Sequence, residues 1–222
     1  MNIILENIGK RFNREWIFRN VSYEFSTGGK YSILGTNGSG KSTLLQIIAG
    51  AMSQSEGEIK YEESAVGSRQ SATNSQQPEF LFRNISYAAP YLELPEEMSW
   101  QEAIRFHGKF KEFVSRFDEE KIISLSGLAS SSEKQIRNFS SGMKQRAKLS
   151  LAILSDTPLL LLDEPATNLD EQSVKWYQNL IAEYAKEKLV IVCSNYNKEE
   201  YPFCTKEFIL KNLSTSQTLQ SR

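Results

Sequence analysis

Short, uninterrupted runs of apolar residues, each ending in a polar turn, recur along this chain. Residues 31–34, 159–162 and 189–193 read YSIL, LLLL and LVIVC. Runs of this length are typical of strands buried on both faces of a parallel sheet. The first run leads through a glycine-rich turn into residues 41–49, a helical pattern that ends at Gly50. Strand, turn and helix in this order predict an α/β fold.

Three other stretches add to this core. The first ~30 residues alternate apolar and polar positions, which predicts an antiparallel sheet. A polar stretch at residues 62–77 predicts a surface loop. From Pro95 to about Gly127 the pattern is helical, and we expect its aromatic stripe to be core. The stripe consists of Trp100, Ile104, Phe106, Phe110, Phe113, Val114 and Phe117.

We therefore predict a single domain over residues 1–222. It has an α/β core with a mostly parallel sheet, an N-terminal antiparallel β subdomain, and an inserted helical subdomain at about residues 90–145.

The composition of the chain limits which partners it can bind and which cellular compartment suits it. The 222 residues carry a net charge of -1, from 26 basic and 27 acidic side chains. Sequence-independent binding to nucleic acid needs a basic surface, so no nucleic-acid partner is expected. Cys193 and Cys204 form no metal-ligand spacing, and we expect two reduced thiols in a cytoplasmic protein. The chain begins without a signal-peptide pattern and has no run of ~20 apolar residues, so any membrane span must come from another chain.

The glycine-rich turn carries a phosphate-binding motif. Residues 35–42 read GTNGSGKS and match G-x-x-x-x-G-K-[ST]. Backbone N–H groups of such a loop and of the following helix cradle phosphates, a lysine reaches the β/γ-phosphates, and a serine hydroxyl binds Mg²⁺. This predicts a P-loop core that binds ATP with Mg²⁺. The residues expected at the phosphates are Gly35, Asn37, Gly38, Ser39, Gly40, Lys41, Ser42 and Thr43.

An acidic pair follows the second apolar run. Asp163 and Glu164 come directly after four leucines, and ligands of open α/β sheets bind at the carboxyl ends of the strands. We expect Asp163, together with Ser42, to hold Mg²⁺. Glu164 is expected to orient and polarise the attacking water.

Between these motifs, residues 139–146 read FSSGMKQR, and residues 166–170 read ATNLD. Here the chain resembles the ABC ATPase family, over about Met1 to Lys211. The first segment is similar to the family signature, and the second to its D-loop. The resemblance implies a head-to-tail dimer with a second copy or a paralogous ATPase subunit, in which each signature caps the other subunit's γ-phosphate. It places Ser140, Ser141, Gly142 and Asp170 at the nucleotide, and Phe12 on the adenine ring.

Three positions depart from the family pattern. The signature has Ser141 and Met143 where glycine and glutamine are usual. Pro90 stands where the Q-loop glutamine is expected after residues 85–89, and the neighbouring Tyr91 is a candidate to supply a hydroxyl instead. Asn195 replaces the switch histidine; it can hydrogen-bond a γ-phosphate but cannot carry a proton. We expect hydrolysis to depend on Glu164, at a rate that these departures leave open.

By family analogy, the first hypothesis is an ATP-hydrolysing subunit that energises a separate membrane permease, peripheral on the cytoplasmic face of the membrane. The alternative is a soluble ABC-type ATPase that regulates a non-membrane protein or a nucleic-acid complex. A third hypothesis keeps the fold but makes the protein a nearly inert ATP-binding switch. Substrate, transport direction, and the choice between homodimer and heterodimer have no signal in the sequence.

Overall fold

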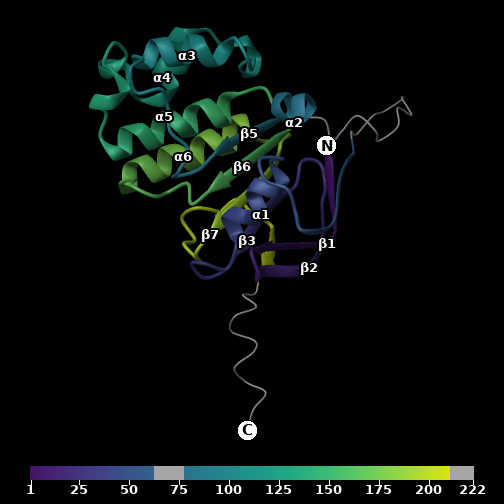
Figure 1. Cartoon of the computed structure of the whole chain (residues 1–222). Coiled ribbons are helices and arrows are strands. Elements are labelled where there is room, and N and C mark those ends of the chain that lie inside the picture. The colour runs from purple at the N-terminus through teal and green to yellow at the C-terminus, as the bar shows by residue number, and fades with distance from the viewer. Residues whose placement is uncertain (63–77, 211–222) are drawn as a thin grey trace.

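A five-stranded sheet forms the centre of the computed structural model, which describes residues 1–62 and 78–210 (Figure 1). Every neighbouring pair of strands in it is parallel, as the apolar runs predicted. The strands, in spatial order, are β5 (Ile85–Ala88), β6 (Leu159–Asp163), β7 (Leu189–Ser194), β3 (Lys30–Leu34) and β8 (Lys206–Ile209).

The second sheet is antiparallel and has three strands. Its order is β2 (Glu15–Phe25), β1 (Asn2–Phe12) and β4 (Glu56–Glu62). The antiparallel sheet was predicted, but its third strand follows the P-loop helix in sequence rather than lying within the first ~30 residues. Apart from Glu62, which ends β4, the loop predicted at residues 62–77 lies outside the described residues, as do residues 211–222 of the predicted domain.

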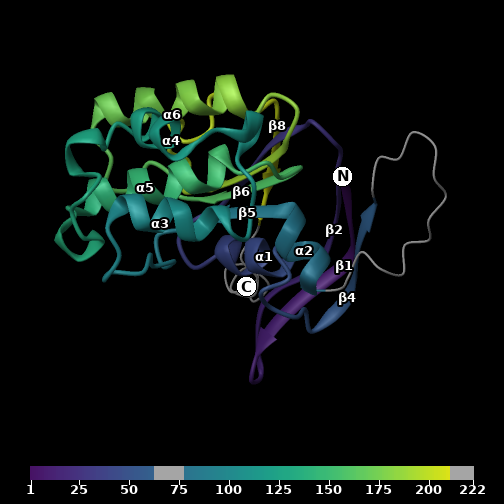
Figure 2. The ribbon, with the colours of Figure 1, turned by 90° about the horizontal axis from the view of Figure 1, so that it is seen from above.

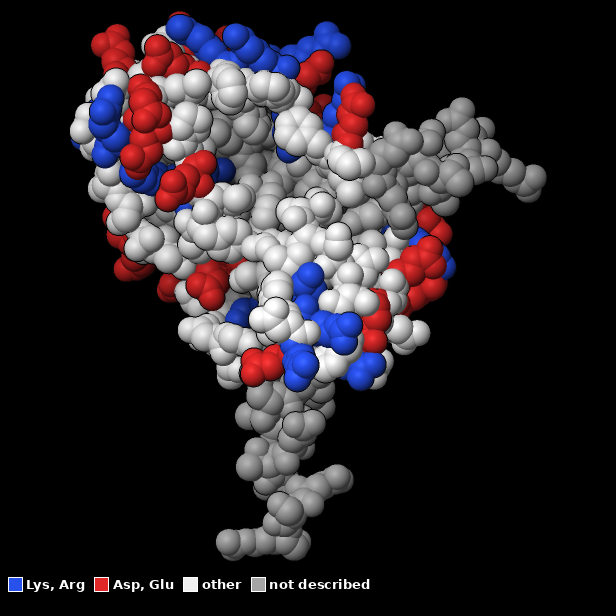
Figure 3. All heavy atoms as spheres, in the orientation of Figure 1, with Lys and Arg blue, Asp and Glu red and all other residues white. Residues whose placement is uncertain are grey.

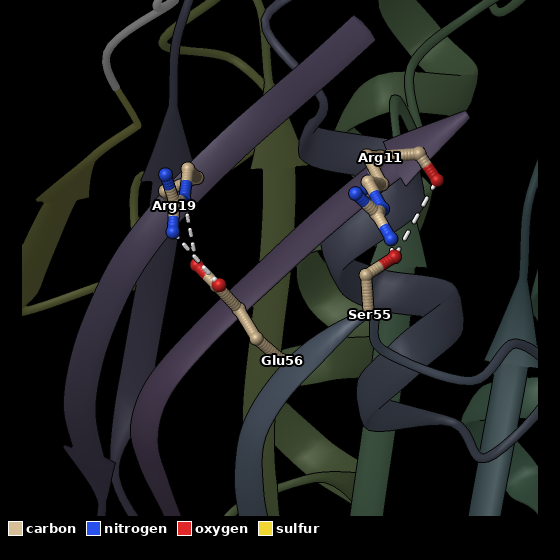
Figure 4. Close-up of polar contacts among 4 residues, drawn as sticks. All are labelled: Arg11, Arg19, Ser55 and Glu56. Carbon is tan, nitrogen blue, oxygen red and sulfur yellow. Dashed lines mark hydrogen bonds and ion pairs between the residues drawn. The ribbon is translucent and has the colours of Figure 1, made fainter. Parts of the chain in front are cut away.

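Polar contacts cross the antiparallel sheet beside the P-loop (Figure 4). The Arg19 guanidinium on β2 donates two hydrogen bonds, of 2.7 and 2.9 Å, to the Glu56 carboxylate on β4. Gly9 on β1 lies between them, and a Cβ there would come within 2.6 Å of the Glu56 side chain. The Arg11 N–H donates to the Ser55 hydroxyl at 3.1 Å. These contacts hold β4 in register with the strands that precede the P-loop.

Helices cover both faces of the parallel sheet. They are α1 (Lys41–Ile48), α2 (Pro78–Asn84), α3 (Trp100–Gly108), α4 (Glu119–Ser126), α5 (Ser141–Leu154) and α6 (Glu171–Tyr184). Short 3₁₀ turns lie at Val114–Arg116, Ala129–Ser131 and Ile136–Asn138. Helices α3 to α6 gather on one side of the molecule, and the antiparallel strands lie on the other (Figures 1 and 2).

Side chains of β6 alternate between two hydrophobic clusters. Leu160 and Leu162 pack with the helical side, around Trp100 and Ile153. Leu159 and Leu161 pack with α1 and the antiparallel sheet. Alternation along a strand places Asp163 on the same face as Leu161, which is the face of the P-loop helix.

The helical pattern of residues 95–127 is broken into separate pieces. Helix α3 ends at Gly108, and α4 begins only at Glu119. Trp100 and Ile104 are buried, as predicted, but Phe106 and Phe110 are 42% and 54% exposed. The prediction that the whole stripe is core was therefore wrong. Phe106 lies within α3, two residues after Ile104, which places it on the opposite, exposed face of the helix. Phe110 follows the end of α3 and is exposed, whereas Phe113 packs in the same core cluster as Trp100.

No helix of the described ranges is both long and apolar enough to cross a membrane. Cys193 and Cys204 are free thiols, the first buried and the second partly so. Figure 3 shows acidic and basic side chains interspersed, with one group of basic side chains over the lower part of the face where α1 and the antiparallel strands lie.

Candidate functional site

The P-loop has the backbone shape that its glycines predict. Gly38 and Gly40 have φ values of +78° and +95°, in the left-handed region that disfavours side chains. A Cβ on Gly40 would also come within 2.6 Å of Ile17 on β2. Helix α1 begins directly after Gly40, so its free N–H groups open onto the loop. The result is a concave run of N–H donors at a helix N-terminus, which suits phosphate.

The Lys41 ammonium closes this loop on itself. It is 5% exposed and donates to the carbonyl oxygens of Gly35, at 2.8 Å, and Thr36, at 3.1 Å. Among the described residues, these neutral carbonyls are its hydrogen-bond partners, and no carboxylate forms an ion pair with it. The side chain is thus anchored inside the loop with its charge available to an incoming phosphate.

Buried polar atoms without partners mark the same place. Both carboxylate oxygens of Asp163 and the Ser39 hydroxyl are buried and accept or donate no hydrogen bond among the described residues. Such groups are costly unless something else satisfies them. A divalent cation with its waters would satisfy the carboxylate. The residues present therefore fit a nucleotide with Mg²⁺.

Charges around Asp163 act in opposite directions on its pKa. Burial raises the pKa of this carboxyl, and the adjacent Glu164 raises it further. The Ser42 hydroxyl and the Lys41 ammonium lower it, although Ser42 does not reach hydrogen-bonding geometry. The structure thus brings Lys41, Ser42, Asp163 and Glu164 together, as the sequence predicted.

Glu164 sits at a backbone position that is unusual for its residue type. Its φ is +42°, and its N–H donates to the Cys193 carbonyl at 2.9 Å. That bond ties the end of β6 to the end of β7. Ser194, the last residue of β7, is buried, and Asn195 directly after it is exposed. Glu164 is partly exposed, and it and Asn195 follow the carboxyl ends of two neighbouring parallel strands, at the same edge of the sheet.

Sequence reasoning missed a third carboxylate here. Glu200 is 4% exposed, and its Oε2 has no hydrogen-bond partner among the described residues. Burial raises its pKa to about 7; the Ser194 hydroxyl and the Ala166 N–H oppose the shift, while Glu164 and Asp163 add to it. The residue lies in a polar run, NYNKEEY, with no apolar pattern to signal burial.

The signature residues line a separate hollow, of about 490 Å³, which contains no P-loop residue. Ser140 is the N-cap of α5 and accepts a hydrogen bond from the Met143 N–H at 3.2 Å. Asp170 caps α6 in the same way, through the Ser173 N–H at 2.7 Å. Both caps face this hollow, so the signature and the D-loop share one surface.

The serine that replaces a signature glycine is accommodated easily. Ser141 is the first residue of α5 and has no positive φ. Gly142 does need to be small, because a Cβ there would lie 3.0 Å from the Asn168 carbonyl oxygen. The replacement therefore leaves the N–H groups at the start of α5 in place.

The aromatic residue expected at adenine is on the surface. Phe12 ends β1 and is 46% exposed, with the Lys10 ammonium 5.0 Å from its ring centroid. It is not part of the core, so its ring is available for stacking.

Known proteins resemble this chain over most of its length. The family model described as ABC transporter matches residues 18–167. An uncharacterized ABC transporter ATP-binding protein of Bacillus subtilis, YybJ, is 27% identical over 87% of this chain and 85% of its own length. The energy-coupling factor transporter ATP-binding protein EcfA1 of Thermotoga maritima is 31% identical over 78% of this chain, which spans 64% of that relative.

Among solved structures, one likeness is to a dimeric post-hydrolysis state of the ATP-binding cassette MJ0796 bound to ADP and Pi. Its TM-score is 0.76 at 19% identity, and the match covers 94% of each chain. At this identity, the likeness supports the fold.

Proposed function

The chain belongs to the ABC transporter family, and from that premise we propose that it is the ATP-binding and ATP-hydrolysing subunit of a transporter. It drives a separate membrane permease through ATP-dependent head-to-tail dimerisation and is peripheral on the cytoplasmic face of the membrane. The observation that carries this proposal is the buried, unpartnered carboxylate of Asp163 beside the P-loop lysine.

In this proposal the P-loop holds the nucleotide. N–H groups of residues 35–43 surround the phosphates, and Lys41 exchanges its two carbonyl partners for β/γ-phosphate oxygens. Phe12 stacks on the adenine ring. Ser42 and Asp163 hold Mg²⁺, which when bound neutralises phosphate charge and fixes the phosphate geometry.

Glu164 prepares the attacking water. A carboxylate at the end of β6 accepts a hydrogen bond from that water and takes its proton as the new bond to phosphorus forms. The hydrogen bond that the Glu164 N–H donates to the Cys193 carbonyl keeps the Glu164 carboxylate at the carboxyl end of β6. Asn195 holds the γ-phosphate through its amide but carries no proton.

Each site is completed by another subunit. The hollow around Ser140, Gly142 and Asp170 is lined by hydroxyls and by N–H groups at a helix start, which are groups that bind phosphate. It lies apart from the P-loop of the same chain, which supports a partner's nucleotide as its ligand. The partner is a second copy of this chain or a paralogous subunit.

An apolar surface supports the permease contact. Phe82, Phe106 and Phe110 are exposed, and they line a groove of about 250 Å³ with Leu94 and Leu151. Exposed apolar grooves of this kind mark protein contacts. Co-purification from detergent-solubilised membranes tests this step: a multi-span membrane protein is expected, and recovery of a soluble partner in its place would contradict it.

Hydrolysis is tested with purified protein. We expect Mg²⁺-dependent release of phosphate from ATP by the wild type, and a loss of about 10²- to 10⁴-fold in Glu164→Gln, because the water loses its base. Lys41→Ala should weaken nucleotide binding about 10- to 100-fold through loss of a charged hydrogen-bond donor. A wild type that releases no phosphate, alone or with its membrane partner, would remove the enzymatic claim.

A further inference from the structure

The end of strand β1 is fastened to the loop that follows the P-loop helix. The Ser55 N–H donates to the Gly9 carbonyl at 2.7 Å. The Arg11 N–H donates to the Ser55 hydroxyl at 3.1 Å, and that hydroxyl donates back to the Arg11 carbonyl at 3.4 Å (Figure 4). Phe12, the next residue, is therefore carried by a strand end whose backbone is fixed relative to α1.

The hairpin that carries Phe12 borders the P-loop. Ile17 and Phe18, on β2, pack so closely against Gly40 that a Cβ there would come within 2.6 and 2.8 Å of them. Phe12 pairs with Glu15 where β1 turns into β2. The ring is thus presented beside the phosphate-binding turn, as the proposed stacking on adenine requires.

The Lys10 side chain lies over the Phe12 ring. Its ammonium Nζ is 5.0 Å from the ring centroid, within the ~6 Å range of a cation–π interaction. The same Nζ donates to the Ser53 carbonyl at 2.7 Å, in the loop after α1. That carbonyl is neutral, and no carboxylate of the described residues forms an ion pair with Lys10. The positive charge beside the ring is therefore not cancelled by a neighbouring acidic side chain.

A cation on one face of an aromatic ring changes the opposite face. Both faces carry negative charge, and two stacked rings repel one another where such faces overlap. An ammonium draws electron density toward itself, which lowers the negative potential of the face that it does not cover. A purine then stacks on that open face with less repulsion. Because Phe12 is 46% exposed, its ring still has surface available for such a base.

The neighbouring cation, Arg11, contacts a different ring. Its guanidinium carbon lies 5.5 Å from the Trp16 ring centroid, and that of Arg19 lies 4.1 Å from the same centroid. Arg11 therefore carries the same charge as Lys10 in the same hairpin without lying over Phe12.

We propose that Lys10 is a positioning residue of the nucleotide site. Its ammonium covers one face of the Phe12 ring and, through that ring, strengthens the stacking of the adenine base on the other face. The Ser53 carbonyl holds the ammonium in this place. The assignment rests on the proposed function, in which Phe12 stacks on adenine.

The test compares the binding of Mg²⁺-ADP and Mg²⁺-pyrophosphate to the protein by isothermal titration calorimetry. Pyrophosphate resembles the phosphate part of ADP but has no base. Lys10→Met keeps a long unbranched side chain and removes the charge. We expect it to weaken ADP binding about 2- to 5-fold, the effect of one exposed cation–π interaction, and to leave pyrophosphate binding unchanged. Lys10→Arg, whose guanidinium can also lie over the ring, should retain most of the affinity for ADP.

A double-mutant cycle shows whether the effect passes through the ring. Phe12→Ala should weaken ADP binding, and adding Lys10→Met to that variant should weaken it no further. Arg11→Met is the matched control and should bind ADP as the wild type does, because Arg11 lies against Trp16.

Equal losses for ADP and pyrophosphate in Lys10→Met would mean that the lysine attracts the phosphates directly, and would overturn the assignment. An unchanged affinity for ADP in Lys10→Met, or a loss that persists in the Phe12→Ala background, would overturn it too. In each of these cases the proposed function would stand. If the wild type bound neither ligand, or if Phe12→Ala bound ADP as tightly as the wild type, the proposed function or its stacking step would be wrong, and the assignment with it.

Discussion

Three carboxylates lie close together near the ends of β6 and β7, and they differ in how deeply they are buried. Asp163 and Glu200 are almost fully buried, whereas Glu164 is partly exposed. Asp163 and Glu164 each add to the raised pKa of Glu200. At the residue scale, the site is an acidic cluster whose repulsion a bound cation would relieve.

Glu200 should make stability depend on pH. Its pKa is about 7 in the folded protein, above the ordinary value of 4.5. The folded state therefore holds its proton more tightly, and the associated stability is present below pH 4.5 and is lost as pH rises through 7. Glu200→Gln should remove this loss. Relative to the wild type, the variant's free energy of unfolding in urea should rise by about 2 kcal/mol from pH 5 to pH 8.

The neighbouring Glu199, which is exposed, provides the control for this measurement. Glu199→Gln should show the wild-type pH dependence. If the free energy of unfolding of Glu200→Gln changed with pH as that of the wild type does, ionisation of Glu200 would not destabilise the folded protein, and the prediction would be wrong.

At the element scale, patterns that depend on one segment were predictable. The buried parallel strands, the P-loop helix and the acidic strand end each follow from a local run of residues. The strand β4 was missed because its pairing with β1, for example Ile3 opposite Tyr61, joins residues that are far apart in sequence. The exposed Phe106 and Phe110 were missed because the aromatic residues were assigned to one buried face, whereas Phe106 lies on the face of α3 opposite Ile104 and Phe110 follows the end of that helix.

The departures from the family pattern illustrate the same limit. That Ser141 is harmless depends on its φ, and the position of Pro90 depends on a turn whose carbonyls accept hydrogen bonds from Lys148. Neither can be deduced from residue type. The buried state of Glu200 likewise arises from β7, α6 and the loop after β6 meeting around it, as the bond from the Tyr177 hydroxyl to its carbonyl at 2.8 Å indicates.

Two substitutions of Ser140, at the start of α5, should distinguish its role as a helix cap from its proposed role in phosphate binding. Ser140→Ala removes the cap on the Met143 N–H, which should cost about 1 kcal/mol in stability. Ser140→Asp keeps an oxygen acceptor and should retain that stability. In the Glu164→Gln background, however, its negative charge should repel a partner's phosphate and prevent ATP-driven dimerisation.

Thermal unfolding measures the first effect and light scattering the second. If Ser140→Asp still dimerised with ATP as the parent does, the signature hollow would not be the surface that meets the nucleotide.

At the scale of the whole molecule, the two groups of residues that we propose as halves of an ATP site lie on different parts of one chain. The P-loop, Asp163 and Glu164 surround one place, and Ser140, Gly142 and Asp170 line another. In the proposed head-to-tail dimer the two places would meet twice, which would couple ATP binding to closure of the dimer. The apolar groove beside α3, the proposed permease contact, lies on the helical side of the molecule.

The most direct test of this account is the molar mass of Glu164→Gln in solution, measured by light scattering with and without Mg²⁺-ATP. The account predicts a 25.3 kDa monomer without nucleotide and a dimer of twice that mass with it. ADP and the double variant with Lys41→Ala should both leave the monomer unchanged. A variant that binds Mg²⁺-ATP and stays monomeric, at concentrations well above its nucleotide Kd, would contradict a site shared between two copies of this chain.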